Sequence, residues 1–217
     1  MEMAKRDPYG RHGLTWVDRV GVFLSRRAIL KHMPRAHELD ILDLGCGYRA
    51  SHLTSLRDIR GRLVGIDFQI CPELKGDSRF SFLEGSVEQG IVKLEAESFD
   101  LVLFISALEH VWEPVQVLGE CQRVMRPGGV LLVNVPTWRG KVFLEVSAFK
   151  LGTSPKAEMD DHKMYYDKRD LWPLLVRAGF RPSDIVLRYH KFGLNLFAVV
   201  RKPPRNLQGD EIVAESR

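Results

Sequence analysis

A short apolar run that ends on an acid and leads into a glycine-rich turn leaves few folds open to this chain. Ile41–Leu44 has the composition of a buried strand, and Gly45, Cys46 and Gly47 follow before a helical pattern begins at Ala50. Glycines let the backbone approach a ligand closely, and the start of a helix offers free N–H groups. This order predicts the first βα unit of a ligand-binding α/β fold.

A second strand-like run ends on an acid about twenty residues further along the chain. It spans Arg62 to Phe68 and places Asp67 near its end. A carboxylate at this position can accept hydrogen bonds from the two hydroxyls of a ribose. Asp43, which ends the first strand just before the glycine turn, suits a positively charged group. Together the two acids favour a ligand that carries both a positive charge and a nucleoside.

Strand and helix signals alternate along most of the chain. Predicted strands lie at 40–44, 62–68, 80–83, 98–105 and 130–135, predicted helices at 15–32, 50–58, 114–125 and 167–178, and a turn at 126–129. Residues 185–190 and 195–201 form two more strand-like runs, which must be antiparallel because their link is short. The pattern predicts an α/β fold with a Rossmann-like, seven-stranded, mostly parallel sheet, an antiparallel C-terminal hairpin and helices on both faces.

The length of 217 residues suits one main domain with a full core. We expect an N-terminal helical extension at residues 1–37, the main domain at 38–202 and a flexible tail at 203–217. Residues 137–166 form a long non-periodic segment that is rich in aromatic side chains and methionine. Long segments of this kind are often binding loops, so we expect a lid here.

Composition narrows the function classes. The net charge is +4, a small and scattered excess that predicts no nucleic-acid partner. Cys46, Cys71 and Cys121 are few and widely spaced, which predicts no metal site and a reducing, cytoplasmic location. No signal peptide and no apolar run of membrane-spanning length is found, so we expect no stable membrane insertion. The oligomeric state stays open.

Several motifs follow in register from about residue 39 to residue 201. They are Asp43-Leu44-Gly45-Cys46-Gly47, Asp67, Ser98-Phe99-Asp100-Leu101-Val102, Ala107-Leu108-Glu109-His110-Val111, Arg123-Val124-Met125-Arg126-Pro127-Gly128-Gly129 and the terminal hairpin. In this combination the chain resembles the class I S-adenosylmethionine-dependent methyltransferases. Its Leu-Glu-His-Val element is similar to the ubiquinone- and menaquinone-type subgroup, which mostly methylates small molecules.

The resemblance implies S-adenosyl-L-methionine as the cofactor, held at the ends of the first four strands. The implied cofactor-binding residues are Asp43, Gly45, Cys46, Gly47, Asp67, Phe68, Ser86, Val87 and Ser106. Gly45 and Gly47 would carry the amino-acid portion, with Asp43 near its ammonium. Asp67 would take the ribose hydroxyls.

The residues after the third and fourth strands would border the rest of the cofactor. By the same resemblance, residues 84–87 would lie along the adenine, and Ser106 with Ala107 would border the methionine arm. The chain departs from the family pattern at two places, with Arg49 where a third glycine is common and Ser86 where an acid is common. A serine hydroxyl can still accept a hydrogen bond from the adenine amino group.

Two histidines are candidates for the catalytic base that an oxygen acceptor would need. His110 follows a buried strand, and His162 lies inside the expected lid. Histidine titrates near neutral pH, which suits this role. Structural roles also stay open, with His110 as a helix-start residue and His162 on a solvated loop. A carbon acid or an amine acceptor would need positioning alone.

Residues 45–50 also satisfy Gly-x-Gly-x-x-Ala, the dinucleotide fingerprint, so an NAD(P)-dependent oxidoreductase is one alternative. Against it, Asp43 would repel a pyrophosphate. A non-catalytic nucleotide-binding module is another alternative. The leading prediction is methyl transfer to an oxygen, nitrogen or carbon of a small-molecule acceptor, such as a quinone, glycan or lipid precursor.

Overall fold

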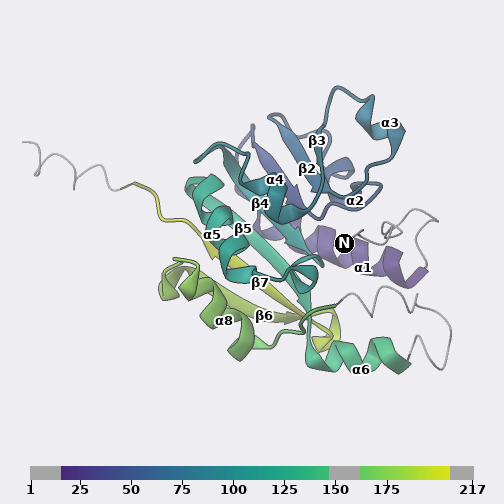
Figure 1. Ribbon diagram of the computed structural model, residues 1–217, viewed down its shortest axis with the longest axis vertical. Helices are drawn as coiled ribbons and strands as arrows, with labels where there is room; N and C mark the ends of the chain where they lie inside the picture. The colour runs from purple at the N-terminus through teal and green to yellow at the C-terminus, as the bar shows by residue number, and fades with distance from the viewer. Residues whose placement is uncertain (1–15, 147–161, 206–217) are drawn as a thin grey trace, which may run out of the picture.

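A seven-stranded sheet with helices on both sides forms the centre of the computed structural model, which describes residues 16–146 and 162–205 (Figure 1). The strands are β1 (Ile41–Leu44), β2 (Leu63–Asp67), β3 (Ser81–Glu84), β4 (Phe99–Ile105), β5 (Met125–Pro136), β6 (Ile185–His190) and β7 (Asn195–Arg201). The helices are α1 (Trp16–His32), α2 (Ser51–Thr54), α3 (Pro72–Lys75), α4 (Val87–Ile91), α5 (Pro114–Val124), α6 (Trp138–Val146) and α8 (Lys168–Arg177). Short 3-10 turns are η1 (Leu108–His110), η3 (Pro182–Asp184) and η4 (Lys191–Gly193).

The strand order is β3-β2-β1-β4-β5-β7-β6. All neighbouring pairs from β3 to β5 are parallel, and β7 runs antiparallel to both β5 and β6. The predicted fold, including the antiparallel C-terminal hairpin, is confirmed. Because β1 to β4 are parallel, the loops that follow them meet at one edge of the sheet.

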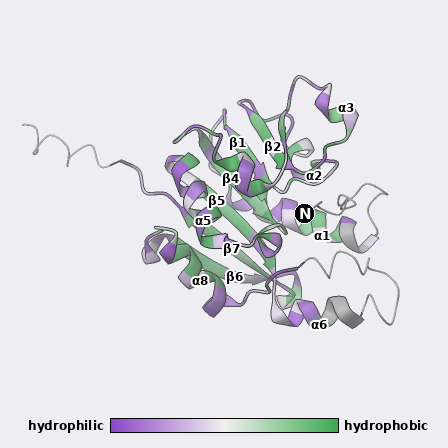
Figure 2. Ribbon diagram, viewed as in Figure 1, coloured by the Kyte–Doolittle hydropathy of each residue, from purple (hydrophilic) through white to green (hydrophobic). Residues whose placement is uncertain are grey.

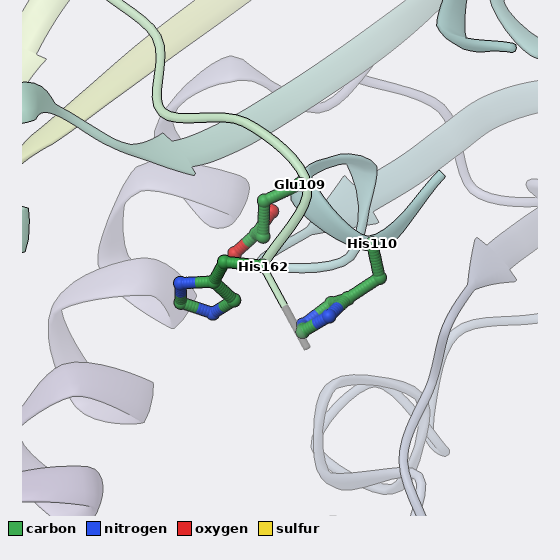
Figure 3. Close-up of side chains that lie close together, drawn as sticks. All are labelled: Glu109, His110 and His162. Carbon is green, nitrogen blue, oxygen red and sulfur yellow. The ribbon is translucent and has the colours of Figure 1, made fainter. Parts of the chain in front are cut away.

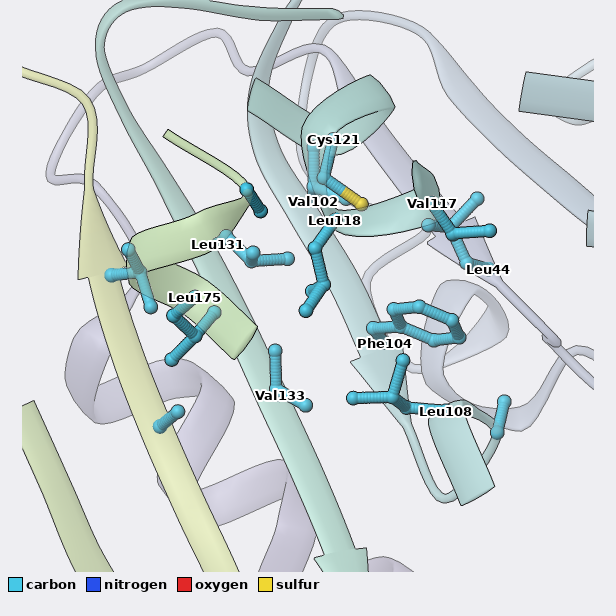
Figure 4. Close-up of a cluster of buried hydrophobic side chains, with 14 of the residues drawn as sticks. Leu44, Val102, Phe104, Leu108, Val117, Leu118, Cys121, Leu131, Val133 and Leu175 are labelled. Atoms are coloured by element: carbon cyan, nitrogen blue, oxygen red, sulfur yellow. The ribbon is translucent and has the colours of Figure 1, made fainter. Parts of the chain in front are cut away.

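Strand β4 shows how the sheet is buried on both faces. Leu101 and Leu103 pack into the cluster that contains Ile29 of α1, whereas Val102 and Phe104 pack into the opposite cluster. Figure 4 shows this second cluster, in which α5 and α8 cover the sheet. Figure 2 shows the apolar character of the central strands. Alternate side chains of one apolar strand therefore serve two cores.

The sequence prediction of a turn at 126–129 is wrong. These residues lie inside β5, where the pairing with β4 shifts register between Phe99 and Leu101. The Gly128 N–H donates to the Lys202 carbonyl at 2.8 Å, and the Lys202 N–H donates to the Gly129 carbonyl at 2.9 Å. These bonds continue the strand beside the end of β7.

Other boundaries also differ from the predictions. The helix expected at 50–58 spans only Ser51–Thr54, since the Thr54 and Ser55 hydroxyls donate to nearby carbonyls and compete with the helical pattern. The segment expected to be non-periodic begins with α6. Its central part, 147–161, lies outside the described residues, as does most of the expected tail at 203–217.

Within the described residues, no helix has the combined length and apolar character needed to cross a bilayer.

Candidate active site

The glycine turn after β1 packs against the loop after β4. Gly45 and Gly47 have φ of +68° and +77°, in the left-handed region that favours glycine. The Gly45 N–H donates to the Ile66 carbonyl of β2 at 2.8 Å. A Cβ on Gly45 would overlap the Cβ of Ala107, so only a glycine lets these two loops touch. This contact fixes the glycine turn beside the tip of β4.

Asp67, at the end of β2, holds this turn from the other side. Its carboxylate accepts hydrogen bonds from the N–H groups of Gly47 and Phe68, both at 2.8 Å. Burial raises the pKa of Asp67, and these backbone hydrogen bonds work against that rise. Each carboxylate oxygen has a second lone pair that can accept from a ligand hydroxyl. The predicted ribose acceptor is thus also part of the turn's own structure.

Asp43 is a buried acidic residue at this edge of the sheet. It lies in the centre of the sheet, paired with Gly65 of β2 and Leu103 of β4, and is fully buried. Neither carboxylate oxygen has a hydrogen-bond partner among the described residues. Burial, with the nearby charge of Asp67, raises its pKa well above the usual value. A buried acid without a partner is unfavourable, so this position favours a cationic or donor ligand.

The other predicted cofactor contacts divide into exposed and buried groups. Cys46 and Val87 are buried in the two core clusters, so they can offer a ligand mainly their backbone. Burial also raises the pKa of the Cys46 thiol, which disfavours a nucleophilic role. The Ser86 hydroxyl caps α4 by accepting from the Gln89 N–H at 3.2 Å, and Phe68 is exposed.

Ser106 sits in a constrained backbone conformation at the tip of β4. Its φ is +54°, and its N–H donates to the Asn134 carbonyl at 2.7 Å. The Asn134 side-chain amide donates to the Ser106 hydroxyl at 3.1 Å, while Asn134 itself is fully buried. Asn134 was not predicted as a site residue. The sequence feature that could have indicated Asn134 is a single amide side chain inside the otherwise apolar run at 130–135.

Glu109, His110 and His162 gather beyond this tip, where η1 meets the segment that begins at residue 162 (Figure 3). One ligand-type atom from each side chain lies within 4.8 Å of the other two. The His110 and His162 rings meet edge to face, with centroids 4.8 Å apart. The structure therefore brings together the two histidines predicted from distant parts of the sequence.

Glu109, the third member of this cluster, is buried. Its Oε2 has no hydrogen-bond partner among the described residues, and burial raises its pKa to about 8. A protonated carboxyl can donate a hydrogen bond, and an ionised one can receive a proton. Carboxylate and imidazole are also ligands for divalent metals, so the three side chains could hold a cation. The sequence predicted no metal site because its cysteines are few and widely spaced, and His162 lies 52 residues from His110.

Main-chain hydrogen bonds hold the segment at 162–166 against the sheet edge. The Lys163 N–H donates to the Glu109 carbonyl at 2.7 Å, and the Tyr166 N–H donates to the Pro136 carbonyl at 3.0 Å. The Tyr165 hydroxyl lies 3.0 Å from His162 Nδ1. Tyr165 belongs to the aromatic-rich segment that was expected to form a lid, and this contact restrains the His162 ring.

Residues 42–133 match the family described as a methyltransferase domain. Among curated proteins, the chain is 28% identical over 163 residues to a probable S-adenosylmethionine-dependent methyltransferase of Mycolicibacterium smegmatis, covering 71% of this chain and 57% of that protein. It is 33% identical over 155 residues to a ubiquinone biosynthesis O-methyltransferase of Hahella chejuensis, covering 68% of this chain and 63% of that protein. The chain thus spans about three-fifths of these relatives.

Solved structures agree on the fold. A SAM-dependent methyltransferase from Archaeoglobus fulgidus superposes with a TM-score of 0.64 at 14% identity, covering 88% of this chain and 96% of that one. At this identity the likeness concerns the fold alone.

Proposed function

We propose that this chain, which carries a class I S-adenosylmethionine-dependent methyltransferase domain, transfers a methyl group to a small-molecule acceptor. The domain match and the fold imply S-adenosyl-L-methionine as the cofactor. The observation that best supports this cofactor is the buried, unpartnered carboxylate of Asp43. A cationic amino-acid ligand would give it the partner that the described residues do not.

The residues present fit the cofactor's parts. Gly45 and Gly47 bring no side chain to the turn after β1, which suits close approach of the amino-acid portion to the backbone, and the Asp67 carboxylate can also accept from ribose hydroxyls. Ser86 and Phe68 lie on the loops after β3 and β2, where an adenine would be placed. When bound, the cofactor supplies an electrophilic methyl group. The protein then has to bind and align the acceptor, and to deprotonate it where the acceptor is a hydroxyl.

On the acceptor side, we assign His110 and His162 as candidate bases. Both are partly buried at the carboxyl edge of the sheet, and their rings touch. Tyr165 contacts His162, and a carboxylate oxygen of the buried Glu109 lies within 4.8 Å of a ring nitrogen of each histidine, a separation that one bridging water would span. A base at this edge would serve a hydroxyl acceptor. The name of the Hahella chejuensis relative, a ubiquinone biosynthesis O-methyltransferase, supports the same acceptor chemistry.

The described parts of residues 137–166 also support a lid. The segment from residue 162 carries the candidate base His162, and helix α6 meets this segment through Trp138 and Tyr165, whose ring centroids lie 5.7 Å apart. The three cysteines are free and buried, in keeping with a reducing cytoplasm.

A labelled-methyl screen tests the proposed function. The protein is incubated with methyl-labelled S-adenosylmethionine and fractionated metabolite extract, with Asp43→Asn as the matched control. We expect label in a small-molecule fraction with the wild type and much less with the control. Cofactor binding without transfer to any fraction would favour the non-catalytic module instead.

A further inference from the structure

The outward face of α1 carries a stripe of exposed apolar side chains. Their exposed fractions are 73% for Trp16, 48% for Val20, 56% for Phe23 and 47% for Leu30. At 3.6 residues per turn, spacings of four, three and seven place all four within an arc of about 80°. Ile29, by contrast, points into the core and is 1% exposed. The apolar stripe is therefore the solvent side of an amphipathic helix.

Basic side chains border this stripe. Arg19, Arg26, Arg27 and Lys31 are exposed, and Asp18 is the only acid in the helix sequence. The Arg27 guanidinium lies 5.9 Å from the centre of the Phe23 ring, so charge and apolar surface are contiguous. None of these four cations forms an ion pair with another residue in the described part of the chain.

We propose that this face of α1 binds the surface of an anionic lipid bilayer. Single exposed apolar residues are ordinary, but a continuous stripe with a basic border has the composition of a helix that lies in the membrane interface. The apolar side chains would enter the headgroup boundary while the cations contact lipid phosphates. Nucleic acid would explain the cations and leave the apolar stripe unexplained.

Helix α1 lies close to the carboxyl edge of the sheet, where the candidate active site is. A Cβ on Gly21 of α1 would lie 3.6 Å from the Lys191 ammonium. Lys191 belongs to η4, which leads into β7 where Asn195 pairs with Pro136 at the end of β5. Binding through α1 would hold that edge near the membrane. The inference stands on the helix itself and does not depend on methyl transfer.

Vesicle flotation of the full chain tests the proposal. We expect the wild type to float with vesicles of phosphatidylcholine and phosphatidylglycerol, to bind pure phosphatidylcholine vesicles much less, and to be released as salt screens the charges. Absence of binding to the mixed vesicles, or equal binding to both kinds, would overturn the proposal.

Two double variants assign the binding to α1. Val20→Ser/Phe23→Ser removes apolar contact, and Arg26→Glu/Arg27→Glu reverses charge. Each should weaken binding about tenfold or more. The control pair Val92→Ser/Arg181→Glu changes a valine of similar exposure and an exposed arginine elsewhere, and should bind like the wild type.

The same variants test whether the fold is intact and whether a second copy of the chain covers the apolar stripe. Each should keep its thermal midpoint and its S-adenosylhomocysteine affinity, which separates membrane binding from the cofactor site. Vesicle binding that survives both α1 variants would overturn the proposal. So would light scattering that shows a wild-type dimer lost in Val20→Ser/Phe23→Ser, because a second copy would then cover the stripe.

Discussion

At the residue scale, the candidate site contains a glycine turn whose backbone and neighbours leave little space for a side chain. Gly45 combines a φ of +68° with direct contact between its Cα and Ala107, so an added Cβ meets both backbone strain and a clash. Gly128 offers a matched comparison, with a φ of +85° and no atom within 4 Å of an added Cβ.

We predict that Gly45→Ala destabilises the fold more than Gly128→Ala does. The left-handed backbone costs about 1–2 kcal/mol at either position, and overpacking adds about 1–3 kcal/mol at Gly45 alone. Urea unfolding measures both free energies, and calorimetry measures the cofactor affinity, which should fall only for Gly45→Ala. Equal destabilisation of the two variants would mean that Ala107 moves freely and that the loops are not locked together.

Asp43 leads to a prediction about pH. Its pKa is raised in the free protein by burial and by Asp67, and a cationic ligand would favour the ionised form. Cofactor affinity should therefore rise with pH through the pKa of Asp43, with a proton released on binding. Asp43→Asn should lower the affinity about tenfold or more and flatten this dependence. Titration in buffers of different ionisation enthalpy measures the proton count, and an unchanged slope in the variant would contradict the assignment.

At the element scale, the segment at 162–166 decides whether the site has a base. Its main chain is anchored to η1 and β5, and its side chains place His162 against His110. We predict that His110→Ala or His162→Ala lowers turnover about 10²-fold or more at saturating cofactor, with cofactor affinity unchanged. Tyr165→Phe, which removes only the hydroxyl that contacts His162, should give a smaller loss.

Two results would change this view of the histidines. Near-wild-type turnover in both alanine variants would leave positioning as the only contribution. Activity that is lost on chelation and restored by a divalent metal would reassign Glu109, His110 and His162 to a cation site.

The regular elements were largely predictable, because their apolar spacing is local information. The strand from Phe99 to Ile105 and the helix from Pro114 were found close to their true bounds for this reason. The stretch at 126–129 has the glycine and proline of a turn, but Lys202, just beyond the end of β7, pairs with it. Such pairing comes from a distant part of the chain, and local turn propensity does not report it.

At the scale of the whole molecule, buried acids couple stability to pH. Burial raises the pKa of Glu109 to about 8 from an ordinary 4.5, so the folded protein favours its protonated form. The stabilisation is fully present below about pH 4.5 and is lost as pH rises through about 8. We predict that the contribution of Glu109 to the free energy of unfolding falls by a few kcal/mol over this window. His52, whose pKa burial lowers to about 4, titrates in the opposite sense, so only a comparison with a variant isolates the Glu109 contribution.

Glu109→Gln isolates this effect, because it keeps the shape and removes the titration. Asp43 titrates in the same direction in both proteins, so the difference between them reports Glu109 alone. Urea unfolding across the window should show a less negative slope of the unfolding free energy against pH for the variant than for the wild type. Identical slopes would mean that Glu109 gains a partner or solvent that the described residues do not supply.

The site itself was predictable only in part. Asp43, Gly45 and Asp67 belong to local motifs and could be named from the sequence. The buried state of Glu109, the support of Ser106 by Asn134 and the meeting of His110 with His162 arise from strand order and long-range packing. These contacts join residues as much as 52 positions apart, and no local pattern encodes them.

Calorimetric titration with S-adenosylhomocysteine and with NAD tests the central claim most directly. The unpartnered Asp43 carboxylate and the glycine turn beside it predict saturable binding of the adenosyl ligand and no binding of NAD. Asp67→Asn, measured in parallel, should bind the adenosyl ligand about tenfold or more weakly, since a charged acceptor for the ribose is lost. Saturable binding of NAD with none of S-adenosylhomocysteine would contradict the account.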